Sequence, residues 1–348
     1  MSRRLFLLSL VTLLGLTLTS CDLSGSNESG CSLSGADIFF ANQGNFGDAN
    51  GSVGAYSSQF DTVTCSSIGE LNSIVQGITL QDENLFVTAN TGSRVDIFSS
   101  SRPSRSAQVS GVNGPRYTAI SGDTTAYVTD QPPFRSSKSP AVRIIDIGAE
   151  DPSIVDSVIV SGTPEGITVS GSHAYAALAA FGTNTNVAKI DVTQRTLDNT
   201  IDVGCATREV VADTDGDVFA LCSDAAEAVI LDGESGTIQT RLALPDTAES
   251  ASGIGHPSYY AASANELYVA TDTDLIRIDT GTNTVDATID VGLSGAPGAV
   301  GYDPTEKTLY VARVAGFTTS GSITLHARDG TKTGSFDAGI APAYLEIR

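Results

Sequence analysis

A short apolar segment with an aromatic residue at its second position recurs seven times along the chain, and this repeat constrains the fold more than any other feature. Successive copies are 41 to 49 residues apart, and the register takes up seven of the 12 Phe and 10 Tyr residues. The aromatic residues are Phe39, Phe86, Tyr127, Tyr175, Phe219, Tyr268 and Tyr310.

Each copy predicts four short strands, and the sixth copy shows this most clearly. We expect its strands near residues 259–262, 267–271, 275–279 and 285–291. The segments are apolar on successive residues, as expected where neighbouring sheets cover both faces of a sheet. Seven such units predict an all-β protein, a seven-bladed β-propeller.

The two ends of the chain predict how the ring closes. The first copy begins at its second strand, residues 37–42, and lacks an innermost strand before it. The C-terminal segment 342–347 resembles the innermost strands expected at 115–120 and 164–169. We therefore expect the C-terminal strand to complete the first blade and remove an exposed sheet edge.

The composition agrees with an all-β fold. The chain has no Trp, one Met, 35 Gly and 17% charged residues, which argues against a helical protein, a coiled coil or a disordered tail. With 40 acidic and 19 basic residues the net charge is −21, so the protein repels phosphate backbones and we expect no nucleic-acid partner. Many acids and few lysines predict a protein that stays soluble in strong salt.

The N-terminus predicts export and a lipid anchor. Residues 1–20 have the basic start and the apolar stretch of a signal peptide, and the stretch is too short to span a bilayer comfortably. Leu18-Thr19-Ser20-Cys21 resembles the bacterial lipobox, in which the Cys is acylated; the alternative is an ordinary signal peptide with an incidental Cys. Acyl chains on Cys21 would be the only membrane contact. Residues 21–35 are expected to form a flexible tether, and residues 36–348 the propeller.

Four further cysteines form an even set in a compartment that permits disulfides. Cys205 precedes an expected hairpin and Cys222 closes it, so we expect this pair, which leaves Cys31 with Cys65. Metal binding by the four is the weaker interpretation, because they have no C-x-x-C spacing.

No catalytic constellation stands out, and we expect neither a metal nor a cofactor. His326 is expected to pack within a strand and His173 to lie solvated in a turn. Residues 213–217 imitate the start of a calcium loop but lack the distant Glu, so a hairpin turn explains them better.

Function is expected instead on the face where loops surround the central channel. The entrances to the innermost strands and four long loops supply the candidate ligand-binding residues Gln76, Arg116, Tyr117, Glu165, Arg208, His256, Tyr259, Tyr344, Phe46, Phe134, Phe181 and Phe317. The two arginines suit a carboxylate, phosphate or amide oxygen; alternatively they form salt bridges with Glu165 or Glu209. Each Phe either stacks on a ligand or partner or packs on its own blade.

The segments Leu267-Tyr268-Val269-Ala270 and Leu309-Tyr310-Val311-Ala312 resemble the YVTN or YncE-like seven-bladed propellers. Residues 42–47 also look like the opening of surface lipoproteins of Bacteroidota-type bacteria, with Gln43 where those proteins commonly have Glu. The resemblance implies capture of a small ligand, in some members cobalamin, for a TonB-dependent outer-membrane transporter.

We therefore expect a monomeric, lipid-anchored, extracytoplasmic protein, placed by this resemblance at the outer membrane or cell surface, that binds a nutrient or cofactor without transforming it. Two alternatives belong to other classes of function. One is an enzyme such as a lactonase or lyase on the same scaffold, and the other is a structural or adhesive surface protein.

Overall fold

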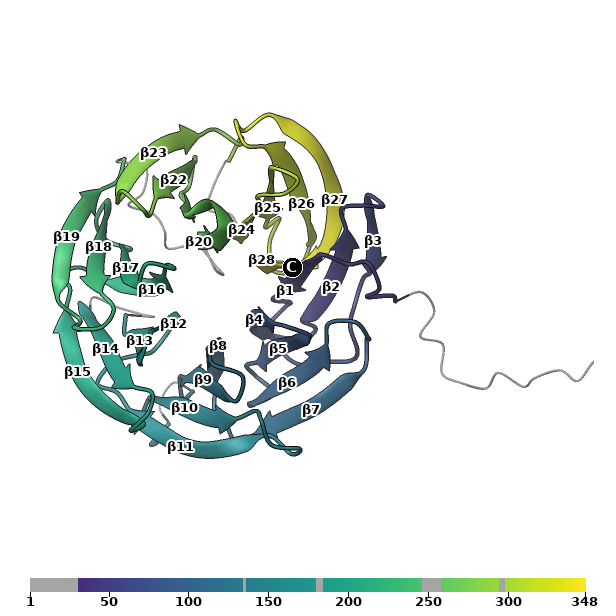
Figure 1. The fold of residues 1–348 in the computed structure, drawn as a ribbon. Coiled ribbons are helices and arrows are strands. Elements are labelled where there is room, and N and C mark those ends of the chain that lie inside the picture. Colours follow the sequence, from purple (N-terminus) through teal and green to yellow (C-terminus); the bar gives the residue numbers. More distant parts are fainter. Residues whose placement is uncertain (1–30, 134–135, 180–183, 246–257, 294–297) are drawn as a thin grey trace, which may run out of the picture.

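The computed structural model describes residues 31–133, 136–179, 184–245, 258–293 and 298–348. In these residues, seven four-stranded antiparallel sheets stand around a common axis (Figure 1). The fold is therefore a seven-bladed β-propeller, as the repeat predicts.

Each blade contributes one strand to each of four concentric positions. The innermost strands are β28 (Pro342–Ile347), β4 (Val75–Gln81), β8 (Pro115–Ser121), β12 (Ile167–Ser170), β16 (Thr207–Ala212), β20 (Ser258–Ala261) and β24 (Ala299–Asp303). The second strands are β1 (Ile38–Asn42), β5 (Asn84–Ala89), β9 (Thr125–Asp130), β13 (His173–Ala177), β17 (Asp217–Cys222), β21 (Glu266–Ala270) and β25 (Thr308–Arg313). The third strands are β2 (Ser52–Ser57), β6 (Arg94–Ser99), β10 (Ala141–Asp146), β14 (Asn186–Asp191), β18 (Glu227–Asp232), β22 (Leu275–Asp279) and β26 (Ser320–Ala327). The outer strands are β3 (Thr62–Cys65), β7 (Arg105–Ser110), β11 (Ser153–Ile159), β15 (Thr196–Asp202), β19 (Ile238–Ala243), β23 (Thr284–Ile289) and β27 (Lys332–Ile340).

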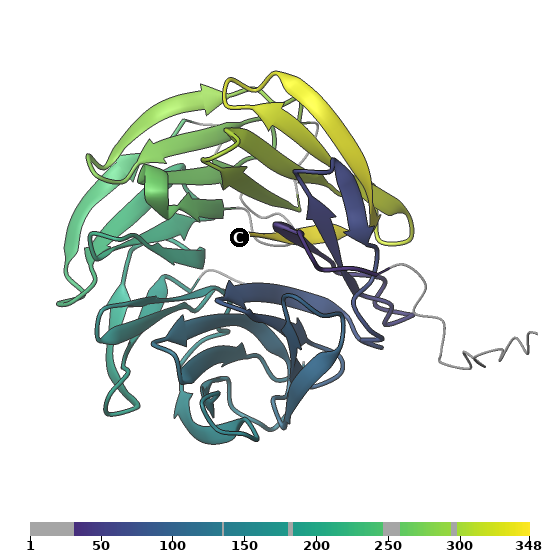
Figure 2. The same ribbon diagram turned by 45° about the vertical axis from the view of Figure 1, so that its right-hand side comes forward.

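The C-terminal strand closes the ring, which confirms the expectation from the two chain ends. β28 pairs antiparallel with β1, with Leu345 opposite Phe40. The backbone N–H of Arg348 donates to the carbonyl of Asp37 over 2.8 Å. Figure 2 shows β28 beside the first strand of the chain, so the first blade is built from both ends of the sequence.

The seven repeated aromatic residues all lie in the second strands and are at most 2% exposed. At this position a side chain packs between its own blade and a neighbouring one, which explains why the apolar pattern does not alternate. The outer strands are different: in β15 six of the seven residues are exposed. The large side chains of the repeat are therefore the core that joins blade to blade.

Several innermost strands begin with an irregularity in their pairing. The register shifts between Val75 and Ile78 in β4, between Pro115 and Thr118 in β8, and between Thr207 and Glu209 in β16. Such bulges turn side chains away from the regular alternation of the strand. These bulges contain Gln76, Arg116, Tyr117 and Arg208, four of the candidate residues from the sequence.

Residues 31–35 are packed against the first blade, so the expected tether extends too far at its C-terminal end. A disulfide joins Cys31 to Cys65, and the Ser32 N–H donates to the Thr64 carbonyl over 2.9 Å. Leu33 is only 1% exposed. A second disulfide joins Cys205 to Cys222, so the structure has the pairing expected from the sequence.

The only helix among the described residues is a single 3-10 turn, η2 (Ala262–Ala264). Consequently, within the described ranges, no helix has the length and apolar character needed to cross a bilayer.

Candidate functional site

The two faces of the ring carry different connections. On the rim face, second strands lead to third strands and the innermost strands begin; on the opposite face, innermost strands turn back into second strands. Those candidate residues from the sequence that the structure describes lie at the rim face or along the adjoining part of the channel, because they precede or begin the innermost strands or follow the second strands.

A buried ion pair joins the third and fourth blades at the mouth of the channel. Arg116 binds Glu165 with two hydrogen bonds, one from Nε to Oε2 over 2.8 Å and one from Nη2 to Oε1. The two side chains are 9% and 1% exposed. The Arg208 Nη2 lies 3.7 Å from the same Glu165 Oε1. The carboxylate holds the pKa of Arg116 above its ordinary value, although burial acts in the opposite direction.

Close approach of neighbouring innermost strands places these side chains. A Cβ added to Gly77 would lie 2.8 Å from the carbonyl oxygen of Arg116, so only glycine leaves room for the next strand. Two buried threonine hydroxyls of second strands fasten the contact: Thr88 Oγ1 donates to the Arg116 carbonyl over 2.8 Å, and Thr129 Oγ1 to the Glu165 carbonyl over 2.7 Å. Both threonines stand two residues after the repeated aromatic residue.

Two tyrosines and a glutamine continue this buried layer. Gln76 Nε2 donates to the hydroxyl of Tyr344 over 2.9 Å, and the ring of Tyr344 meets that of Tyr117 edge to face at 5.9 Å. Burial raises the pKa of Tyr344 to about 12 and also raises the pKa of Tyr117, so both hydroxyls are neutral. Gln76 Oε1 is buried with no hydrogen-bond partner among the described residues.

We call Gln76, Arg116, Tyr117, Glu165, Arg208 and Tyr344 the pore-mouth network. The structure favours the salt-bridge alternative for the arginines, because Arg116 and Arg208 both lie against Glu165. A buried pair of this kind holds its partners in one geometry. Arg116 therefore lines the site with its positive charge neutralised by Glu165.

A half-open pocket of about 590 Å3 lies on the rim face beside this network. We call it the rim pocket. Its lining comes from loops of the first four blades: Phe46, Asn90, Thr91, Ser93, Asn113, Gly114, Arg116, Gln131, Pro132, Pro133 and Thr163. Phe46 is 59% exposed, so it does not pack back onto its own blade. Of the candidates from the sequence, Phe46 and Arg116 meet here.

A second hollow, of about 320 Å3, lies in the channel itself. Tyr117, Tyr259 and Tyr344 line it together with residues further along the innermost strands, such as Thr168 and Glu346. Burial raises the pKa of Tyr259 as well. Because Tyr117 lines this channel cavity and its neighbour Arg116 lines the rim pocket, the pore-mouth network is the layer between the two hollows.

The remaining candidates are not brought together. Phe317 is 42% exposed in the seventh blade and lines neither hollow. His256, Phe134, Phe181 and the predicted acylation residue Cys21 lie outside the described residues.

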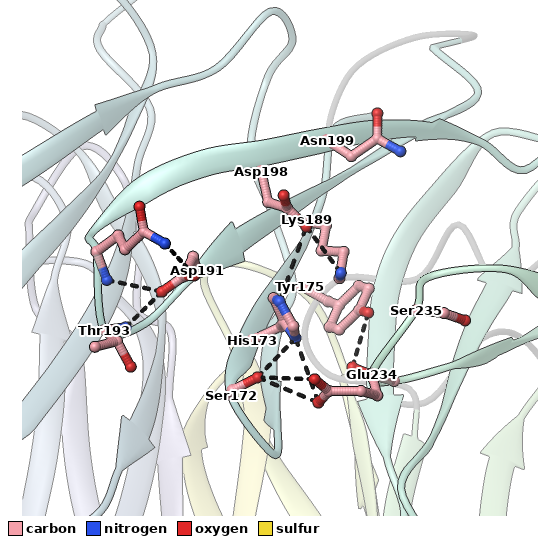
Figure 3. A network of polar contacts seen from close by, with 12 residues as sticks. Ser172, His173, Tyr175, Lys189, Asp191, Thr193, Asp198, Asn199, Glu234 and Ser235 are labelled. Atoms are coloured by element: carbon pink, nitrogen blue, oxygen red, sulfur yellow. Dashed lines mark hydrogen bonds and ion pairs between the residues drawn. The ribbon is translucent and has the colours of Figure 1, made fainter.

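On the opposite face, His173 is 8% exposed, so the expectation that it lies solvated in a turn is wrong. Its ring, at the start of β13, lies between a carboxylate of the outer strand β15 of the same blade and one of the turn between β18 and β19 in the next blade. Nε2 lies 3.8 Å from Asp198, and Nδ1 lies 3.8 Å from Glu234 (Figure 3). Lys189 Nζ binds Asp198 over 2.8 Å, and this contact lowers the pKa of Asp198. We call these four residues the His173 cluster.

Among the described residues, one group has metal-ligand types close together: Cys205, Cys222 and Glu227. The two cysteines form a disulfide, so their sulfurs are not thiolate ligands. This group lies on the hairpin of the fifth blade, apart from the residues that line the rim pocket.

Sequence reasoning missed most of the polar lining of the rim pocket. Asn113, Gln131 and Thr163 are absent from the predicted set, although each directly follows or precedes a predicted strand on the rim face. The signal that would have found Gln131 is its position after β9, followed by two prolines that fix the chain.

The fold defines the class, a seven-bladed β-propeller, and the sequence defines the family. The family model described as "Domain of unknown function (DUF5074)" matches residues 36–335, so the chain belongs to this family. Among curated proteins, no sequence matches the chain.

Several solved structures share the fold at low sequence identity. A protein from Bacteroides uniformis described as a "putative 6-phosphogluconolactonase" is 10% identical with a TM-score of 0.67, covering 90% of this chain and 100% of that chain. A functionally unknown protein from Desulfotomaculum acetoxidans is 12% identical with a TM-score of 0.68, covering 90% and 98%. Hydrazine synthase from Kuenenia stuttgartiensis is 17% identical with a TM-score of 0.63, covering 78% and 88%. At these identities the likeness concerns the fold alone.

Proposed function

We propose that the protein is a lipid-anchored, extracytoplasmic binding protein that captures a small ligand in the rim pocket. The observation that carries the proposal is the exposed ring of Phe46 beside a half-open pocket of about 590 Å3, a volume typical of small-molecule sites. An exposed aromatic residue at the edge of a concave surface is typical of recognition, because burial of its ring by a ligand is favourable.

The architecture supports capture by a rigid site. Loops contribute the lining, and the buried pore-mouth network and the closed ring hold the strands from which these loops extend. A pre-formed site costs little conformational entropy when a ligand binds. The proposed acylation of Cys21 would keep this site at a membrane surface, where a TonB-dependent transporter is the proposed partner.

A thermal-shift panel of corrinoids, haem, siderophores and sugars tests the proposal. A ligand at a hundred times its Kd stabilises the folded chain by about 2.7 kcal/mol, so a binder raises the melting temperature measurably. Phe46→Ala should clearly reduce the shift without changing the melting temperature of the free protein, since the ring is exposed. A panel that produces no shift, or a shift that Phe46→Ala leaves unchanged, contradicts capture in the rim pocket.

Two further measurements test the anchor and the partner. Mass spectrometry of the mature protein should find an acylated N-terminal cysteine at position 21, and a soluble mature form would contradict the anchor. The protein should co-purify from membranes with an outer-membrane barrel. Turnover of a lactone that is lost on chelation would instead support an enzyme, the class of function named in the description of the Bacteroides uniformis protein.

A further inference from the structure

We infer that the ligand of the rim pocket is an uncharged oligosaccharide. This inference rests on the proposed function and deepens it by naming the chemistry of the ligand. It follows from three properties of the pocket: the charge of its lining, the hydrogen-bonding capacity of its amide side chains, and the apolar surfaces of its Phe and Pro residues.

The walls of the rim pocket are neutral even though the chain carries a net charge of −21. Arg116 is the one ionised side chain among the described lining residues, and Glu165 neutralises it with two hydrogen bonds. Asp130 lies behind the lining, fully buried, and accepts hydrogen bonds from Asn113, Gly114 and Arg143. Among the described lining residues, an anionic ligand therefore finds no unpaired cation, and a cationic ligand finds no unpaired carboxylate. The ammonium of Lys138 lies beside the pocket and donates to Asn113 Oδ1.

Amide groups in the pocket retain hydrogen-bonding capacity. Gln131 Nε2 is buried without a partner among the described residues, an arrangement that costs free energy. A ligand relieves this cost when the side chain turns its amide toward the pocket. Asn90 Nδ2 donates to the Pro115 carbonyl over 3.1 Å, which fixes its amide with Oδ1 as a remaining acceptor. Hydroxyl groups both donate and accept, so a polyhydroxylated ligand satisfies an unused donor and an unused acceptor together.

Apolar surfaces alternate with these amides. The ring of Phe46 is 59% exposed, and Pro132 and Pro133 line the same pocket. The face of an aromatic ring is electron-rich and attracts the partly positive C–H groups on one side of a sugar ring. The lining extends from Phe46 in the first blade to Thr163 in the fourth, so it suits several linked rings better than a single flat heterocycle.

Isothermal titration calorimetry on the purified full chain tests the inference with defined probes. Maltotriose, xylotriose and chitotriose serve as neutral probes, and trigalacturonate serves as an anionic probe of similar size. We expect saturable binding of at least one neutral trisaccharide and at least tenfold weaker binding of trigalacturonate. Cobalamin, haem and a ferric siderophore are titrated in parallel.

Two variants and two matched controls locate the binding. Phe46→Ala and Gln131→Leu should each weaken trisaccharide binding by about tenfold, the loss of one ring contact or one hydrogen bond. Phe60→Ala removes a Phe of the same blade that is 63% exposed, and Gln81→Leu removes a glutamine at the far end of β4. Both controls lie toward the opposite face and should leave the affinity unchanged.

The outcomes separate this inference from the proposed function. If cobalamin, haem or the siderophore binds in a Phe46-dependent manner and no trisaccharide binds, the capture function stands and the oligosaccharide inference fails. The inference also fails if trigalacturonate binds as tightly as the neutral probes, or if Phe46→Ala and Gln131→Leu leave trisaccharide affinity unchanged. Absence of binding by every probe overturns both proposals.

Discussion

The two faces of the propeller carry similar features in different settings. The first blade exposes one Phe toward each face, Phe46 beside the rim pocket and Phe60 in the turn between β2 and β3. Each face also holds a cluster of opposite charges, the pore-mouth network on the rim face and the His173 cluster on the opposite face. On the rim face the carboxylate of Glu165 is 1% exposed, whereas on the opposite face Asp198 and Glu234 are 46% and 77% exposed.

The comparison shows that both faces hold ion pairs, but only a buried carboxylate leaves the surface around its ion pair without net charge. In the pore-mouth network the charges cancel inside the wall, and amides and an aromatic ring remain at the surface. In the His173 cluster the carboxylates reach water and add to the negative field of the protein. The rim face is therefore the better surface for an uncharged ligand.

Removal of residues 343–348 should unfold the ring and so disrupt the sites on both faces. We expect this deletion to reduce stability more than any other change. The deletion removes the buried side chains of Ala343, Tyr344 and Leu345 and leaves β1 as an unpaired edge. Circular dichroism should show loss of the cooperative melt of the full chain. Unchanged thermal unfolding would contradict closure by β28.

Arg116→Met and Lys189→Met compare how much the two charge clusters contribute to stability. Each variant removes one positive charge and keeps an unbranched apolar side chain in its place. Without Arg116, Glu165 stays buried with only Arg208 nearby, so the free energy of unfolding should fall by about 3–5 kcal/mol. Without Lys189, Asp198 remains hydrated and the change should be far smaller. Urea denaturation measures both.

A double variant sharpens this test. Arg116→Met combined with Glu165→Leu leaves neither charge buried alone, so it should recover most of the lost stability. Equal effects of Arg116→Met and Lys189→Met would contradict the distinction between the two faces.

Tyr344→Phe tests the layer between the rim pocket and the channel cavity. The variant leaves Gln76 Nε2 buried without its acceptor, so the free energy of unfolding should fall by about 1–3 kcal/mol. Phe fits the space left by Tyr, and the two rings at the channel can still meet edge to face. Urea denaturation showing no loss would mean that this hydrogen bond does not hold the layer.

His326, in β26 toward the opposite face, is expected to make a smaller, pH-dependent contribution to the stability of the fold. Burial lowers its pKa, and the positive charge of Arg313 acts in the same direction. Since the folded pKa lies below the unfolded value of about 6.5, the unfolded chain binds more protons, and stability is lost as the pH falls below that value. His326→Asn should reduce the fall in melting temperature between about pH 7.5 and about pH 5.5. An identical pH profile in the variant would contradict this assignment.

The architecture was predictable because the same local pattern occurs in every blade. The aromatic residue from Phe39 to Tyr310 marks each second strand, and the innermost strand missing before residue 37 is supplied by 342–347. Position within the repeat also predicts that Arg116 and Glu165 approach the channel.

The partners of these side chains were not predictable from position alone. Arg116 lies within the bulge of β8, and its partner Glu165 is 49 residues away. Their meeting depends on how β4 approaches β8 at Gly77 and how Thr129 of β9 holds the Glu165 carbonyl. The surroundings of His173 likewise depend on the outer strand β15, which carries Asp198, and on the turn of the next blade that carries Glu234. Such contacts come from the packing of blade on blade, which a repeat pattern does not encode.

Hydrogen exchange with the strongest ligand of the thermal-shift panel tests the central claim, capture on the rim face, most directly. At saturation we predict slower exchange of backbone amides at residues 90–93 and 113–114, which line the rim pocket, and unchanged exchange at residues 58–61 around Phe60. Protection confined to turns of the opposite face, with the rim segments unchanged, would contradict the account.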